Sequence, residues 1–103
     1  MREVKQTAVF AKWFKKLNDT VAKIAIVKRL FRLEAGNTGD CKSVGDSVFE
    51  LRINVSKGYR IYFMNLDLKV ILLLIGGDKT SQEADIKKAK KLAKEVKVDG
   101  KNF

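Results

Sequence analysis

The chain has no histidine and no proline, and it has one cysteine among its 103 residues. The absence of histidine removes the commonest general base of enzymes and the commonest metal ligand. Cys41 can form neither an internal disulfide nor a cysteine metal cluster, and no histidine can activate it, so we interpret it as a packing residue. We therefore expect no metal, no cofactor and a reducing compartment, the cytoplasm.

Long hydrophobic runs are also lacking. The longest, Val70 to Ile75, is far too short to span a bilayer. The mixed charges of Met1 to Gln6 do not resemble a signal peptide, so we expect no membrane segment. A length of 103 residues suits one hydrophobic core, and we expect residues 1–103 to form a single domain.

Acidic side chains are outnumbered by basic ones. The chain has 22 lysines and arginines against 12 aspartates and glutamates, which gives a formal net charge of +10. Such an excess favours an anionic partner: nucleic acid, an acidic protein or a membrane surface. The alternative is a basic surface that only keeps the protein soluble.

Three strand-like runs, 49–55, 59–64 and 70–75, organise the sequence. In the first two, apolar residues alternate with polar or mixed ones, which predicts strands with one apolar face each. The short break that ends at Gly58 predicts a hairpin between them. The third run is apolar throughout, which is typical of a central strand covered on both sides.

The hairpin places polar side chains on one face of the predicted sheet. With the apolar faces in register, Arg52, Arg60 and Tyr62 share the opposite face with Glu50. Lys79 follows the central strand and is expected beside them. Two guanidiniums, a phenol and an ammonium on one surface indicate an anion or phosphate site.

Along the chain, helices are predicted before and after these strands. Thr7 is a candidate N-cap for a first helix that ends near Leu17, and a second follows to about Ala35. The apolar stripe expected in the second helix is Ile24, Val27, Leu30 and Phe31. Gly76-Gly77 predicts a turn before the last helix, which a capping box from Thr80 to Glu83 would begin.

These elements predict an α+β domain. An N-terminal helical hairpin packs on one face of a twisted antiparallel sheet of three to five strands, and a helix ends the chain. The other face of the sheet carries the polar residues and is the expected place for a site.

Three segments resemble a known family of proteins. They are Phe-Glu-Leu-Arg, Gly-Tyr-Arg-Ile-Tyr-Phe and Leu-Leu-Ile-Gly-Gly-Asp-Lys-Thr-Ser-Gln. This combination is similar to the addiction-module killer proteins of the RelE/ParE superfamily, the toxins of type II toxin–antitoxin systems. The resemblance implies a RelE-like fold and a toxin that binds the ribosome and cleaves messenger RNA. It also implies a helix-turn-helix antitoxin as partner, and operator DNA as a partner only through the antitoxin complex.

The resemblance also implies roles for the polar residues. Arg60 matches the arginine that stabilises the phosphate in the superfamily. Lys79 stands near the position at which related toxins carry a second basic catalytic residue. Tyr62 could stack on a base or donate a proton, and Glu50 could act as a base or pair with an arginine. The residues expected to bind RNA are Arg52, Lys57, Lys42 and Lys87.

The sequence also departs from the ribosome-dependent members of the superfamily. Val48 and Glu50 stand where those members carry lysines, and the position of their catalytic tyrosine falls near Asp85. Two alternatives therefore stay open. The protein could inhibit DNA gyrase as the ParE branch does, or it could be a non-toxic homologue that binds an antitoxin and regulates.

Overall fold

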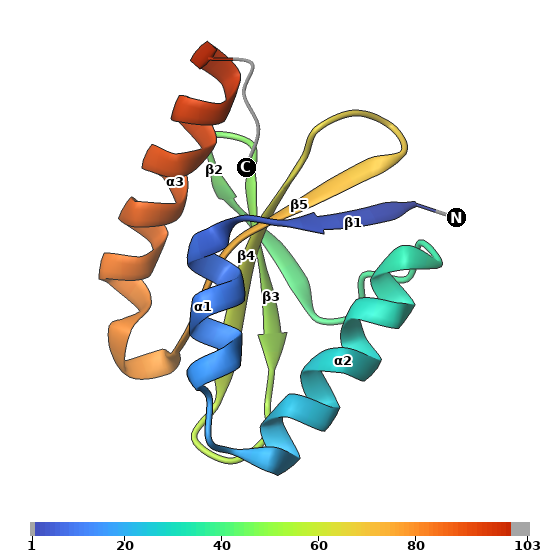
Figure 1. Ribbon diagram of the computed structural model, residues 1–103, viewed down its shortest axis with the longest axis vertical. Coiled ribbons are helices and arrows are strands. Elements are labelled where there is room, and N and C mark those ends of the chain that lie inside the picture. Colours follow the sequence, from blue (N-terminus) through green and yellow to red (C-terminus); the bar gives the residue numbers. More distant parts are fainter. Residues whose placement is uncertain (1, 100–103) are drawn as a thin grey trace.

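A computed structural model of the protein describes residues 2–99 (Figure 1). In chain order the elements are β1 (Glu3–Gln6), α1 (Ala8–Lys16), α2 (Thr20–Glu34), β2 (Cys41–Gly45), β3 (Val48–Ile53), β4 (Tyr59–Asn65), β5 (Val70–Asp78), the short 3-10 helix η1 (Lys79–Ser81) and α3 (Gln82–Asp99). The strands form one sheet in the order β1-β5-β4-β3-β2. The α+β fold class predicted from the sequence is confirmed.

The N-terminal strand makes the sheet mixed rather than antiparallel throughout. β1 pairs with β5 in parallel, whereas β2, β3, β4 and β5 form an antiparallel meander. Thr7 ends β1 by donating its backbone N–H to Leu73 O at 3.0 Å and its hydroxyl to Leu74 O at 2.6 Å. The same hydroxyl accepts from Phe10 N at 3.0 Å, so Thr7 is the N-cap of α1, as predicted.

Helices cover both faces of the sheet, which corrects the expectation that they share one face. The core between the sheet and α1 and α2 includes Phe10, Ile26 and Leu73. On the other face α3 buries Tyr62 and Leu72 beneath its small residues Ala89 and Ala93. β5 is apolar on both faces, so it requires cover on both, and alanines allow α3 to approach closely. In Figure 1, α1 and α2 diverge from their short connecting turn rather than packing along each other as a tight hairpin.

The buried side of α2 is not the one that the sequence predicted. Three residues of the predicted stripe are largely exposed, at 53%, 40% and 65%: Ile24, Val27 and Phe31. The side chains of α2 that are fully buried belong to Ala22, Ile26 and Leu33. Because α2 has apolar residues on more than one side, its periodicity could not select the inner one.

Arg29 belongs to the inner side of α2. It precedes Leu33 by one helical turn, and its guanidinium donates to the carbonyl oxygens of Arg52, Thr38 and Asp40. A charged residue on the inner side of α2 makes that side look polar in the sequence. In the structure, however, the donors of Arg29 satisfy backbone carbonyls of the neighbouring loop and strand. That interaction requires the tertiary structure and explains the wrong prediction.

The pair Gly76-Gly77 does not form the predicted turn but continues β5. Gly76 pairs with Ile61 of β4, and Gly77 pairs with Arg60. A Cβ on Gly76 would lie 2.3 Å from the ring of Trp13, and one on Gly77 would lie 1.9 Å from Asp85 Oδ2. The glycines therefore admit a tryptophan on one face of the sheet and a carboxylate on the other.

The last helix begins differently from the predicted capping box. The carboxylate of Asp78 accepts from the backbone N–H of Thr80 at 2.9 Å, so Asp78, not Thr80, is the N-cap of η1. α3 then follows η1 without a break. None of the helices within residues 2–99 combines the length and the apolar character needed to cross a bilayer.

Candidate functional site

The register of the β3–β4 hairpin gathers the predicted site residues. Glu50 lies opposite Tyr62, and Arg52 lies opposite Arg60. The alternation of side chains places all four on the sheet face that α3 covers. The juxtaposition predicted from the sequence is therefore present, and it lies beside the beginning of α3 rather than on an open sheet.

Glu50 lies at the centre of this group. Its side chain is fully buried and accepts hydrogen bonds from Arg52 Nε at 3.0 Å, Tyr62 OH at 3.0 Å and Gln82 Nε2 at 2.8 Å. Arg60 Nε and Lys42 Nζ lie 3.9 Å and 4.0 Å from its oxygens. One buried carboxylate thus connects two neighbouring strands, the start of α3 and the edge strand β2.

The surroundings of Glu50 determine its protonation. Burial by itself raises the pKa of a carboxyl group, but the hydrogen bonds from Arg52, Gln82 and Tyr62 outweigh it and lower the pKa of Glu50 below its ordinary value of 4.5. Glu50 is therefore ionised at neutral pH and is a weak proton acceptor. This disfavours a role as general base and favours one in holding the two arginines.

Tyr62 is buried beneath α3 and has no exposed ring face on which a base could stack. Burial and the hydrogen bond to Glu50 raise the pKa of its phenol well above the ordinary range. A phenol that donates to a buried carboxylate and holds its proton so tightly is a poor acid. Both roles expected for Tyr62 are therefore disfavoured, and its hydroxyl instead helps to orient Glu50.

Arg60 has donors that no group among residues 2–99 uses. Only 13% of its side chain is exposed, yet Nε and Nη1 make no hydrogen bond within the part of the chain that the structure describes. A buried donor without a partner costs about 1–3 kcal/mol. Nε and Nη1 are shielded from solvent, so it is the charge of this guanidinium, held beside but not on a carboxylate, that can attract an anion such as phosphate.

Gly58 brings Lys79 close to Arg60. The backbone of Gly58 has a φ of +80°, and its carbonyl accepts from the backbone N–H of Lys79 at 3.2 Å. A Cβ on Gly58 would contact both Lys79 Cδ, at 3.5 Å, and Arg60 Nη1, at 3.6 Å. Gly58 thus marks the point at which the guanidinium of Arg60 and the methylene chain of Lys79 come close to each other.

The four residues expected to bind RNA differ in their distance from this group. Arg52 and Lys42 contact Glu50, as described above. Lys57 lies in the hairpin turn, largely exposed, and pairs with Asp78 at 3.7 Å. Lys87 is exposed on α3, two residues beyond Asp85, where helical spacing directs it away from the sheet. The structure therefore brings Arg52 and Lys42 together with Arg60 but leaves Lys87 apart.

Three polar residues at the start of the last helix were missed from the sequence as members of the site. Gln82 donates to Glu50, and Ser81 donates its hydroxyl to Asp85 at 2.6 Å, directly above Gly77. Ser81 and Gln82 end one of the three segments singled out in the sequence, and Asp85 falls near the tyrosine position noted there, but neither observation assigned them a role. Within residues 2–99, no three cysteine or acidic side chains gather closely enough to hold a metal ion.

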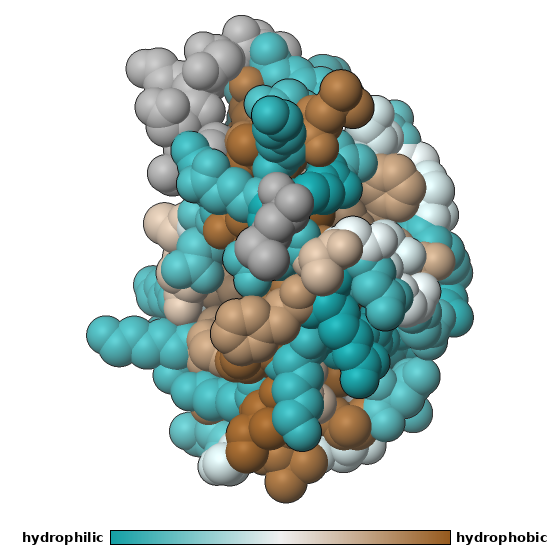
Figure 2. All heavy atoms as spheres, turned by 90° about the vertical axis from the view of Figure 1, so that its right-hand side faces the viewer, coloured by the Kyte–Doolittle hydropathy of each residue, from teal (hydrophilic) through white to brown (hydrophobic). Residues whose placement is uncertain are grey.

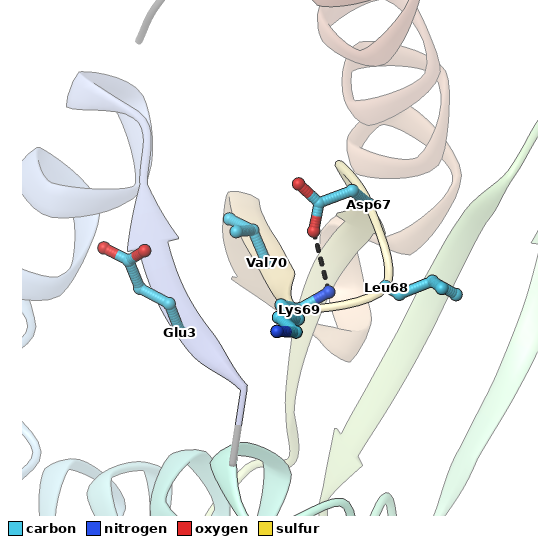
Figure 3. A pocket seen from close by; sticks show the side chains of 5 residues that line it. All are labelled: Glu3, Asp67, Leu68, Lys69 and Val70. Atoms are coloured by element: carbon cyan, nitrogen blue, oxygen red, sulfur yellow. Dashed lines mark hydrogen bonds between the residues drawn. The ribbon is translucent and has the colours of Figure 1, made fainter.

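A large surface hollow lies elsewhere on the molecule. Its volume is about 610 Å³, and it is formed by Glu3 and by the turn and strand start from Asp67 to Val70 (Figure 3). In the close-up, the Asp67 carboxylate accepts the backbone N–H of Lys69 within this turn. This hollow brings no group of cations together, so we place the candidate site at Arg60.

The pH dependence of stability should report the ionisation of Glu50. Because its pKa is lower in the folded protein than in the unfolded chain, its contribution is present above about pH 4.5 and is lost as pH falls through the folded-state pKa. Urea unfolding of the wild type and of Glu50→Gln should differ most at neutral pH. The difference should shrink as the pH falls below about 4.5, and a difference that stays constant would contradict the assignment.

Comparison with known proteins places the chain in a family. Residues 12–97 match the family described as phage derived protein Gp49-like (DUF891). The chain belongs to the Gp49-like family. An uncharacterized protein of Haemophilus influenzae is 48% identical to this Gp49-like protein over 94 residues, which are 91% of this chain and 95% of the relative.

Solved structures show the same fold as the Gp49-like protein. The intact RelBE toxin–antitoxin complex of E. coli contains a chain with a TM-score of 0.63 and 21% identity, covering 76% of this chain and 96% of that one. The isolated E. coli RelE toxin has a TM-score of 0.62 and 20% identity, and the match covers 84% of this chain and 98% of that one. The RelE-like fold predicted from the sequence is confirmed.

Proposed function

We propose that this Gp49-like protein is a ribosome-dependent messenger RNA endonuclease that inhibits translation. The observation that carries the proposal is the guanidinium of Arg60, which is largely buried and whose Nε and Nη1 make no hydrogen bond within residues 2–99. The side chain of Lys79 approaches Arg60 beside Gly58. Two neighbouring cationic side chains suit a phosphodiester better than a neutral substrate.

The reaction proposed for this site is an internal attack on the RNA backbone. The ribose 2′-OH attacks the adjacent phosphorus and gives up its proton to solvent water. The bond from phosphorus to the 5′-oxygen breaks, which leaves a 2′,3′-cyclic phosphate on one fragment, and the 5′-oxygen of the other fragment takes up a proton. Arg60 binds the non-bridging oxygens as negative charge grows on them, and the Lys79 ammonium stabilises or protonates the leaving oxygen. Arg52 and Lys42 hold the neighbouring phosphates, while Glu50 keeps the arginines in place.

The partners and location follow from the same proposal. A helix-turn-helix antitoxin binds the toxin, the complex reaches operator DNA through the antitoxin, and the target is the translating ribosome in the cytoplasm. The positive net charge suits both messenger RNA and an acidic antitoxin segment. We further propose that residues 1–103 act as one toxin domain.

Primer extension on a reporter transcript after brief induction tests this function. We expect new 5′ ends inside the reading frame of the reporter, and we expect them to disappear when its start codon is removed, because cleavage requires translation. Growth arrest with intact messenger RNA would overturn the proposal and favour gyrase inhibition, which a supercoiling assay measures. A folded protein that does not arrest growth would instead be the regulatory homologue.

A further inference from the structure

The outward face of α2 carries apolar side chains that nothing in residues 2–99 covers. Val21, Ile24, Val27 and Phe31 are 63%, 53%, 40% and 65% exposed. They follow one another at spacings of three and four residues and so form a stripe along the helix. Figure 2 shows hydrophobic side chains gathered on the lower half of this side of the molecule, where α2 lies in Figure 1.

A hollow continues this stripe toward the edge of the sheet. Its volume is about 360 Å³, and its apolar lining comes from α2, β1 and β5: Val4, Val27, Leu30, Phe31 and Leu73. A stripe beside an apolar hollow can receive the large side chains of another helix, as in helix-in-groove recognition. A single exposed leucine would need no explanation, but a continuous patch of this kind indicates an interaction site.

The charges around the stripe restrict the partner. Lys28 and Arg32 are exposed on α2 next to Ile24 and Phe31, and the charged residues that line the hollow, Lys5 and Glu34, are of opposite sign. Two copies of this chain would bring these cations together, in addition to a net charge of +10 on each copy. Like charges across an interface are unfavourable, whereas an acidic partner would complement them.

We propose that the outward face of α2, with the adjoining hollow, binds an acidic amphipathic helix of a partner protein. Apolar side chains of that helix pack on Ile24 and Phe31 and enter the hollow, and its acidic flanks lie against Lys28 and Arg32. This surface is on the opposite side of the sheet from Arg60. Binding here therefore leaves the candidate site open and can be tested without any assay of RNA cleavage.

A synthetic peptide provides the test. The probe is a fluorescein-labelled helix of about 18 residues with leucines at i, i+3, i+4 and i+7 and glutamates beside them, long enough to become helical. We expect fluorescence anisotropy with the whole protein to give a Kd on the order of 10 µM, and amide shifts in NMR spectra to map to α2 and β1. A peptide with lysine in place of each glutamate should bind at least about tenfold more weakly.

Protein variants separate the apolar and the charged contributions. We expect Ile24→Ser/Phe31→Ser, which keeps the net charge, and Lys28→Ala/Arg32→Ala each to weaken binding by at least about tenfold. Lys91→Ala/Lys94→Ala on α3 removes as much charge as the second pair and should change Kd by less than about twofold. All six positions are exposed, so the variants should fold, which thermal unfolding verifies. No binding by the wild type, or equal binding by all variants, would overturn the proposal.

Discussion

Replacement of Arg60 by alanine is expected to reduce messenger RNA cleavage by about 10²–10³-fold, the effect of removing one preorganised group that stabilises developing charge. The alanine variant loses a guanidinium whose Nε and Nη1 make no hydrogen bond within residues 2–99, whereas the neighbouring Arg52 is already engaged by Glu50. The measurement is the rate at which primer-extension products appear after induction, normalised to the amount of soluble toxin.

Two further variants make this expectation specific. Arg60→Lys keeps the charge but cannot bind phosphate with two parallel N–H groups, so it should recover only part of the activity. Lys15→Ala removes a charge from the exposed side of α1 and should cleave like the wild type. Unchanged cleavage by a folded Arg60→Ala protein would remove Arg60 from the site and the proposed mechanism with it.

Replacement of Glu50 by alanine is expected to lower the free energy of unfolding by about 3–5 kcal/mol, the usual effect of breaking a buried charge network from one side. The substitution would leave the donors of Arg52, Tyr62 and Gln82 without their acceptor beneath α3. It would also leave two arginines facing each other without the carboxylate between them. Small domains have total stabilities of about 5–15 kcal/mol, so this loss should be evident in urea unfolding at neutral pH.

Two control variants test whether the loss of stability comes from the hydrogen bonds of Glu50. Glu50→Gln preserves the shape and one acceptor oxygen, so it should lose less stability than alanine. Glu83→Ala removes an exposed carboxylate from the first turn of α3, and we expect a change within about 0.5 kcal/mol. A loss of less than about 1 kcal/mol in Glu50→Ala would show that the buried hydrogen bonds do not stabilise the fold.

The hydrogen bonds of Glu50 affect both the packing of α3 and the arrangement of the basic residues. Gln82 joins the first turn of α3 to the carboxylate that also contacts Arg52 and lies near Arg60. The position of α3 and the arrangement of the basic residues are therefore coupled through a single side chain. Stability and cleavage should fall together in Glu50→Ala, whereas Arg60→Ala should affect cleavage far more than stability.

The local features of this protein were determined by its sequence alone. Alternation along two strands and a break at Gly58 were sufficient to place Arg52, Arg60 and Tyr62 on one face, because a shift of one residue would bury the arginines in the apolar core. The N-cap at Thr7 and the interior position of β5, between β1 and β4, follow from equally local patterns: a hydroxyl before an apolar helix, and the apolar run from Val70 to Ile75. The RelE-like fold that the same segments implied was confirmed by the solved structures.

Only the tertiary structure decided which faces of these elements are covered. The inner side of α2 depends on Arg29 meeting carbonyl oxygens from distant segments, and the two glycines of β5 are needed because Trp13 and Asp85 approach them from opposite faces. Likewise, Glu50 became a buried acceptor because α3 brings Gln82 onto that face of the sheet. Periodicity describes one element at a time, whereas burial and hydrogen-bond partners depend on how separate elements pack together.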